Sequence, residues 1–221
     1  MKKLILSLFL ALILTPPRAG AVEKVLYPNA NGSTGYQDLA AKSAGNHYVE
    51  VDESDSAPDT GTYVYGVTPS GGATKEETEN MEDCGSLVNG DSIPDNAVFD
   101  SVKVHNRTKV STVSTDAPMT ILWYNGTTAV DVTNITLSLT YVDNYEKRTT
   151  NLTGGTWTKA NINALQCGWK IYSYEAISAT VTGTLTNLHI FYHLPSTAQR
   201  SRTIIKDTED TKGLTEGGLI R

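Results

Sequence analysis

Hydrophobic and polar residues alternate along two stretches of this chain with the period of two that β-strands show. In the first stretch, apolar Ile135, Leu137 and Leu139 alternate with polar residues as far as Tyr141. In the second stretch, residues 180–194, the even positions carry threonines and then apolar side chains. One polar and one apolar face indicate half-buried antiparallel strands. We expect five of these side chains in the core: Ile135, Leu137, Leu139, Leu188 and Ile190.

Further stretches rich in Thr, Val, Tyr and Ile lie between closely spaced turn residues, as in all-β proteins. The Asn125-Gly126 pair predicts a hairpin turn. A single short helix is expected at Lys159–Cys167, with Thr158 as N-cap and Gly168 just past its end. The expected additional strands are Tyr48–Val51, Thr62–Val67, Val98–Val110, Thr120–Tyr124, Thr127–Val132 and Trp169–Tyr174. The predicted fold is an all-β antiparallel β-sandwich with one short helix.

The N-terminus has the pattern of a secretory signal peptide. Two lysines precede the apolar run Leu4–Leu14, and Ala19-Gly20-Ala21 has the small residues of a cleavage site. The run of about 11 residues is too short to span a bilayer, which needs about 20. We therefore expect a secreted protein, extracellular or at the cell surface, with no membrane span in the mature chain.

The remaining sequence divides by composition. We expect a signal peptide at 1–21, an N-terminal strand and loose segment at 22–46, a β-sandwich domain at 47–194 and a polar tail at 195–221. Val22–Tyr27 is strand-like, and it pairs either within its own sandwich or with another copy. Thr203–Ile205 in the tail is a second candidate for an added strand, against the alternative that the tail is disordered.

Charge narrows the range of partners. The leader holds three of the 18 basic residues and none of the 24 acidic ones, so the formal net charge falls from −6 to −9 after cleavage. An acidic chain lacks the basic footprint of nucleic-acid binding, and we expect no nucleic-acid partner. The expected partners are further copies of the chain, joined through strand edges, and surface glycans.

Cys84 and Cys167 lie on a secretory route, where a disulfide between them is one alternative and two buried thiols the other. No histidine is close to either cysteine in the sequence, which argues against a catalytic thiol.

Two acidic stretches, Glu50–Asp59 and Glu76–Asp83, are candidates for cation binding. The alternative for both is a solvated loop. The second stretch, Glu76–Asp83, fits the solvated alternative better. His189 and His193 are four residues apart on one strand, about 13 Å, which is too far to share a metal ion. We expect no cofactor other than calcium, with these ligands: Glu50, Asp52, Glu53, Asp55 and Asp59.

Asparagines in N-x-Ser/Thr sequons are candidate glycosylation sites in a secreted chain. A protein rich in Thr and Asn also generates such sequons by chance. The five sequon asparagines are Asn31, Asn106, Asn125, Asn134 and Asn151.

Several segments together resemble a known family. The clearest is Gly155–Lys170, where a tryptophan and a short helix precede Leu-Gln, a small residue, Gly and a strand. Tyr48–Glu53, Asp59–Val64 and Val98–Val104 add to the likeness, which covers Tyr48–Leu194. The chain resembles the jelly-roll-like β-sandwich domain family of tailed-phage virion proteins and prokaryotic surface proteins. The resemblance implies a decoration, fibre or surface module without catalytic residues, and the signal peptide favours a surface or secreted form.

The sequence shows no serine-hydrolase, metalloprotease or Cys/His motif, and we expect no enzymatic activity. The main functional hypothesis is a secreted structural protein that self-assembles as a filament, surface-layer or virion-type subunit. The alternative is a carbohydrate-binding or adhesion module, in which large aromatic side chains stack on sugars. The candidate stacking residues are Trp123, Tyr124, Trp157 and Trp169.

Overall fold

The computed structural model describes residues 20–42, 46–56, 60–69, 73–85, 87, 92–112, 119–132, 135–172 and 178–195. Gly20–Leu194 belong to one folded unit. Residues 1–19 of the predicted signal peptide and the tail beyond Pro195 lie outside the described residues. None of the helices that the structure describes is long and apolar enough to cross a membrane.

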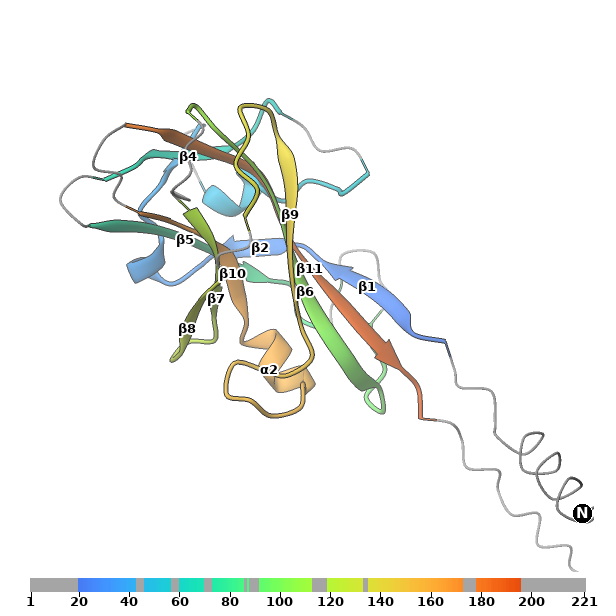
Figure 1. Cartoon of the computed structure of the whole chain (residues 1–221). Coiled ribbons are helices and arrows are strands. Elements are labelled where there is room, and N and C mark those ends of the chain that lie inside the picture. Colours follow the sequence, from blue (N-terminus) through green and yellow to red (C-terminus); the bar gives the residue numbers. More distant parts are fainter. Residues whose placement is uncertain are drawn as a thin grey trace, which may run out of the picture. The chain divides into compact units, whose positions relative to one another are not determined.

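Two antiparallel sheets form this unit, which confirms the predicted β-sandwich (Figure 1). The six-stranded sheet has the order β3 (Ala40–Ala41), β4 (Val64–Val67), β11 (Thr180–His193), β6 (Val98–Val110) and β9 (Val142–Arg148), and β1 (Val22–Leu26) also pairs with β11. The five-stranded sheet has the order β2 (Pro28–Asn31), β5 (Thr74–Met81), β10 (Gln166–Tyr172), β7 (Met119–Tyr124) and β8 (Ala129–Val132).

The long central strand β11 follows the alternation predicted around Leu188 and Ile190, and its neighbour β6 has the predicted bounds. Val104 lies opposite Leu188 and Val102 opposite Ile190, and all four side chains are fully buried. The side chains between them, including His189, point to the other face of the sheet, because successive residues of a strand alternate between faces. This outer face of the six-stranded sheet carries the candidate site.

The inner face of the five-stranded sheet supplies two of the three tryptophans of the core. Trp123 lies opposite Cys167, and Trp169 lies opposite Ile121. Glu77 of β5 lies opposite Trp169 on the other side of β10, so it shares the inner face with these apolar side chains.

The helix starts where the sequence predicts. Helix α2 spans Lys159–Asn163, and the Thr158 hydroxyl accepts a hydrogen bond from the Asn161 N–H at 3.2 Å. The helix ends four residues earlier than predicted, and Gly168 is a strand residue rather than a helix terminator. A Cβ on Gly168 would lie 2.0 Å from the Glu77 carbonyl oxygen, so this position needs glycine for close strand packing.

The strand predicted over residues 135–141 is wrong. Val142–Arg148 takes the pairing position beside β6. In the preceding segment Thr136 N–H donates to the Asn144 side chain at 2.6 Å, outside any strand. Ile135 and Leu137 still pack against the core, but Leu139 is 61% exposed.

Two other local predictions are wrong. Residues 47–50 form a 3₁₀ turn, η2 (His47–Glu50), instead of a strand, and Glu50 accepts a hydrogen bond from the Tyr63 N–H. The segment 29–45, expected to be loose, contributes β2, a second 3₁₀ turn η1 (Thr34–Tyr36) and β3, although 43–45 lie outside the described residues. The N-terminal strand β1 pairs with β11 of its own chain, with Val22 opposite Tyr192.

Candidate functional site

Acidic and imidazole side chains alternate across the outer face of the six-stranded sheet. We call this set the outer-face network: Glu23, Asp55, His105, Arg107, Asp143 and His189. The strands β1, β6, β9 and β11 supply five members, and the loop that follows η2 supplies Asp55. His105 pairs in register with Asn187, and His189 pairs with Lys103, so the two histidines lie diagonally across the β6–β11 ladder.

His105 contacts a carboxylate through each ring nitrogen. Its Nδ1 atom lies 3.1 Å from Asp55 Oδ1, and its Nε2 atom lies 3.0 Å from Asp143 Oδ1. Arg107 also donates to both oxygens of Asp143, at 3.1 and 3.0 Å. The ring of Tyr145 stacks on the imidazole with centroids 4.4 Å apart, so His105 is only 3% exposed.

His189 is held in a similar way from the other side. Its Nδ1 atom lies 2.7 Å from Glu23 Oε1. Its Nε2 atom lies 2.9 Å from Asp55 Oδ2 in an ion-pair contact, and it makes no hydrogen bond to a described residue. The side chain is about 95% buried.

Asp55 is the centre of the network. Asn187 donates to its Oδ1 atom at 2.6 Å and to the Glu53 carbonyl at 3.1 Å, which fastens the loop to β11. Burial disfavours the charged form of Asp55, but the contacts with His105, His189 and Asn187 outweigh it and hold the pKa of Asp55 well below its usual range. Asp55 is therefore a carboxylate at neutral pH, and one third of its side chain is exposed.

A second polar group, the interior acid cluster, lies at the inner face of β5: His47, Glu77 and Glu79. Glu77 Oε1 lies 2.8 Å from His47 Nδ1 and accepts a hydrogen bond from Gln37 at the same distance. Among the residues that the structure describes, none forms a hydrogen bond with either oxygen of Glu79. Burial and the neighbouring charge of Glu77 raise the pKa of Glu79 to about 10, so Glu79 is a neutral acid at neutral pH.

This cluster corrects the prediction that Glu76–Asp83 is a solvated stretch. Glu77 and Glu79 are fully buried, and Glu82 is 2% exposed. Successive residues of β5 point to opposite faces of the sheet, so the strand itself determines which glutamates face inward. The sequence does not predict this strand, because its inward positions are acidic.

The predicted calcium ligands do not converge. Glu50 accepts from the Tyr63 N–H and Glu53 accepts from the Thr62 hydroxyl, while Asp52 is exposed. Among the described residues, the acidic members of that set do not form a group of three with closely spaced oxygens; only Asp55 joins such a group, with His105 and His189. Asp59 lies outside the described residues.

The sequons differ in exposure. Asn106 is fully buried and Asn151 is 9% exposed, so neither amide is accessible to a glycan in the folded chain. Asn125 is half-buried at its turn, where its side chain accepts from the N–H groups of residues 127 and 128. Asn31 is half-buried in β2, and Asn134 lies outside the described residues.

The candidate stacking aromatics do not form a surface platform. Trp123 and Trp169 are fully buried and Trp157 is 4% exposed, with its indole N–H donating to the Arg148 carbonyl. Tyr124 is half-buried against Tyr36, with ring centroids 4.4 Å apart. The tryptophans fill the core instead of presenting a face to a sugar.

Cys84 and Cys167 are buried in the same core cluster as free thiols. Burial raises the pKa of Cys84 to about 11, and the complete burial of Cys167 raises the pKa of that thiol further. Both groups are therefore unreactive thiols at neutral pH.

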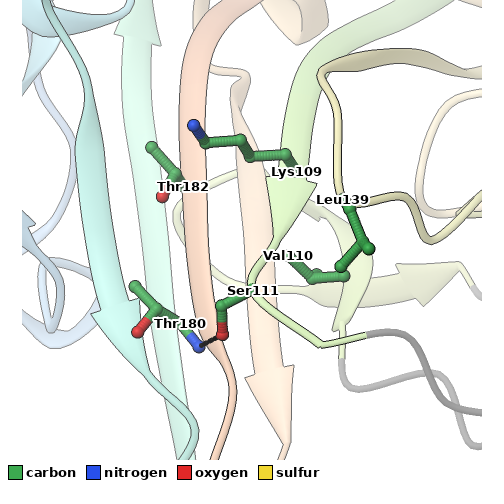
Figure 2. Close-up of a pocket in the computed structure, with 6 residues that line it drawn as sticks. All are labelled: Lys109, Val110, Ser111, Leu139, Thr180 and Thr182. Atoms are coloured by element: carbon green, nitrogen blue, oxygen red, sulfur yellow. Dashed lines mark hydrogen bonds between the residues drawn. The ribbon is translucent and has the colours of Figure 1, made fainter.

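A shallow surface pocket of about 370 Å³ lies at one end of β6 and β11 (Figure 2). Thr180 N–H donates to the Ser111 hydroxyl there, and Leu139 forms one wall. Lys109 is its one charged lining residue and also lies over the Tyr141 ring. No histidine or carboxylate lines the pocket, so it does not have the convergent polar groups of a reactive site.

The β9 edge continues the outer-face network to the border of the sheet. Among the described strands, β9 pairs with β6 alone, and Asp143, Tyr145 and Lys147 are exposed on its outer face. The sequence did not identify the histidine groups, because their members come from segments up to 166 residues apart. The sequence contains one signal for these residues. His105 and His189 each directly follow a core position, so both belong on the opposite face of their strand.

Comparison with known proteins adds no relative: no family model, no curated protein and no solved structure matches this chain. Its function is therefore argued from the two sheets and the groups they position.

Proposed function

We propose that this chain is a secreted extracellular structural subunit that associates with copies of itself through its sheet edges. The observation that carries the proposal is the charge pattern of β9. When two β9 strands pair antiparallel around Tyr145, Asp143 of each copy lies opposite Lys147 of the other. Opposite charges in such cross-strand pairs are stabilising, and like charges are destabilising.

The charges distinguish this register from some of its neighbours. A shift by one residue in one direction places Asp143 opposite Glu146, which is a like-charge pair, and a shift in the other direction places it opposite Arg148. The charges thus oppose part of the possible pairings of the exposed edge, and the arrangement around Tyr145 is two-fold symmetric. The strand β8 ends the five-stranded sheet and offers a second edge, which is what growth beyond a dimer requires.

Light scattering after size-exclusion chromatography, with electron microscopy of the same fractions, tests the proposal. We expect wild-type dimers or larger assemblies, and monomers for Lys147→Glu at the same concentration. Lys109→Glu is the matched control. Each of the two lysines lies over an aromatic ring, with the ammonium of Lys147 4.4 Å and that of Lys109 4.5 Å from the ring centroid. Lys109 differs in that it lies outside β9. Wild-type monomers at every concentration and salt would overturn the proposal.

A further inference from the structure

The outer-face network contains three side chains whose donor atoms lie close enough together to share one metal ion. Asp55, His105 and His189 each offer one ligand atom, and these atoms lie within 4.8 Å of one another. His105 Nδ1 and His189 Nε2 approach opposite oxygens of the Asp55 carboxylate, at 3.1 and 2.9 Å. Donor atoms of a tetrahedral zinc site lie about 3.3 Å apart, given zinc–ligand bonds of about 2.0 Å. The two nitrogen–oxygen distances to Asp55 are close to that value, and the three ligand atoms lie within 4.8 Å of one another.

The Nε2 atom of His189 is the independent observation that points to a ligand. This side chain is about 95% buried, and its Nε2 atom makes an ion-pair contact with Asp55 at 2.9 Å but no hydrogen bond to a described residue. A buried polar atom without a hydrogen bond is destabilising unless another group satisfies it. A metal ion between the imidazole and the carboxylate supplies that group.

The groups behind the histidines match the outer shell of a metal site. The second nitrogen of His105 contacts Asp143, and the second nitrogen of His189 contacts Glu23. Histidines that ligate metals usually bind a carboxylate, a carbonyl or water through the other ring nitrogen, which fixes the ring orientation. Here both histidines turn their remaining nitrogens toward Asp55.

The surrounding charge also favours a cation. Three carboxylates, Glu23, Asp55 and Asp143, lie around the two histidines. Arg107 pairs with Asp143, and the ammonium of Lys103 lies 3.8 Å from Glu23. One third of the Asp55 side chain is exposed, which gives an ion access from solvent.

We propose that Asp55, His105 and His189 bind one transition-metal ion, with Zn²⁺ as the best fit. Two imidazole nitrogens and one carboxylate suit zinc better than calcium, which prefers six to eight oxygen ligands. The three protein ligands leave a fourth position open. The ion joins the loop carrying Asp55 to β6 and β11, so it stabilises the sandwich from outside its core.

Titration calorimetry of the chelator-treated mature protein with Zn²⁺ tests this site. We expect one ion per chain and a melting temperature that rises with zinc concentration. Asp55→Asn, which is nearly isosteric, and His189→Asn should each weaken zinc binding at least about tenfold. His193→Asn is the control, since His193 lies on the same strand face but contacts Asp100 instead.

A measurement on the unmodified protein separates metal binding from misfolding of a variant. X-ray absorption of the zinc-loaded wild type should show nitrogen and oxygen ligands, two of them imidazoles, and no sulfur. Three outcomes would overturn the proposal: no zinc binding at millimolar concentration, binding that survives Asp55→Asn and His189→Asn unchanged, or binding lost in His47→Asn. The last outcome would assign the ion to the interior acid cluster.

Discussion

Asn106 joins the two sheets through the core by donating a hydrogen bond from its side-chain amide to the Gly168 carbonyl oxygen, 2.7 Å away. The amide comes from β6 of one sheet and the carbonyl from β10 of the other. Because Asn106 is fully buried, water cannot replace either partner.

Asn106→Ala should lower the free energy of unfolding by about 1–3 kcal/mol, since it removes this bond and leaves a buried carbonyl without it. Asn96→Ala is the control, because Asn96 is exposed in the turn before β6. Urea unfolding of the two variants and the wild type measures the difference. Equal stability of both variants would contradict a bridging role for Asn106.

Gly168 itself should not tolerate a side chain. A Cβ there would lie 2.0 Å from the Glu77 carbonyl oxygen, whereas a Cβ on Gly85 would meet nothing within 4 Å. We expect Gly168→Ala to destabilise the fold by about 1–3 kcal/mol or more, as overpacking does, and Gly85→Ala to leave it nearly unchanged. Thermal unfolding of the pair checks this, and similar melting temperatures would show that β5 and β10 can separate without penalty.

The interior acid cluster should make stability depend on pH. The pKa of Glu79, raised by burial and by Glu77 to about 10, lies far above its unfolded value. The folded chain therefore binds an extra proton between the two pKa values. Stability is then fully present below the unfolded pKa and falls as pH rises toward 10, by at most about 1.4 kcal/mol per pH unit.

Glu79→Gln keeps the size of the side chain and removes the titration. We expect the variant to be more stable than the wild type at pH 8 and to show a flatter stability profile from pH 5 to 9. Asp83→Asn, at an exposed position nearby, should keep the wild-type slope. Chemical unfolding at several pH values measures the profiles, and parallel slopes for Glu79→Gln and wild type would refute a neutral buried Glu79.

The sequence predicted the parts of the fold in which local pattern and burial agree. Val98–Val110 forms β6 with the predicted bounds, and Thr180–His193, where polar and apolar residues alternate, forms β11. Thr158 was identified as a helix cap because capping depends on neighbouring residues alone. The strand β5 was not predicted, because Glu77 and Glu79 occupy inward positions that the pattern assigns to apolar residues.

The candidate site could not be predicted for a different reason. Asp55, His105 and His189 lie in three segments, and only the register between β6 and β11 and the path of the loop bring them together. The alternation of side chains along each strand places both histidines on the outer face, but it does not give the distance between them. Residue spacing correctly excludes a pair of His189 and His193, yet it gives no indication of a pair formed across strands.

Asn151 organises the turn that precedes helix α2. Its side chain donates to the Thr156 carbonyl and to Asn161, and it accepts from the N–H and hydroxyl of Thr153 and from Gly155 N–H, which makes five hydrogen bonds. Asn151→Ala removes all five and should lower the free energy of unfolding by about 2–4 kcal/mol.

Thr153→Val separates this structural role from glycosylation, because it destroys the same sequon but removes only the bonds of one hydroxyl. In protein from a host that does not glycosylate, we expect a loss of about 1 kcal/mol for this variant, well below that of Asn151→Ala. Tryptophan fluorescence during urea unfolding measures both losses, since Trp157 donates from its indole to the Arg148 carbonyl at the start of the same loop and Trp123 and Trp169 report on the core. If the two variants instead lose equal stability, the Asn151 side chain does not hold the turn together.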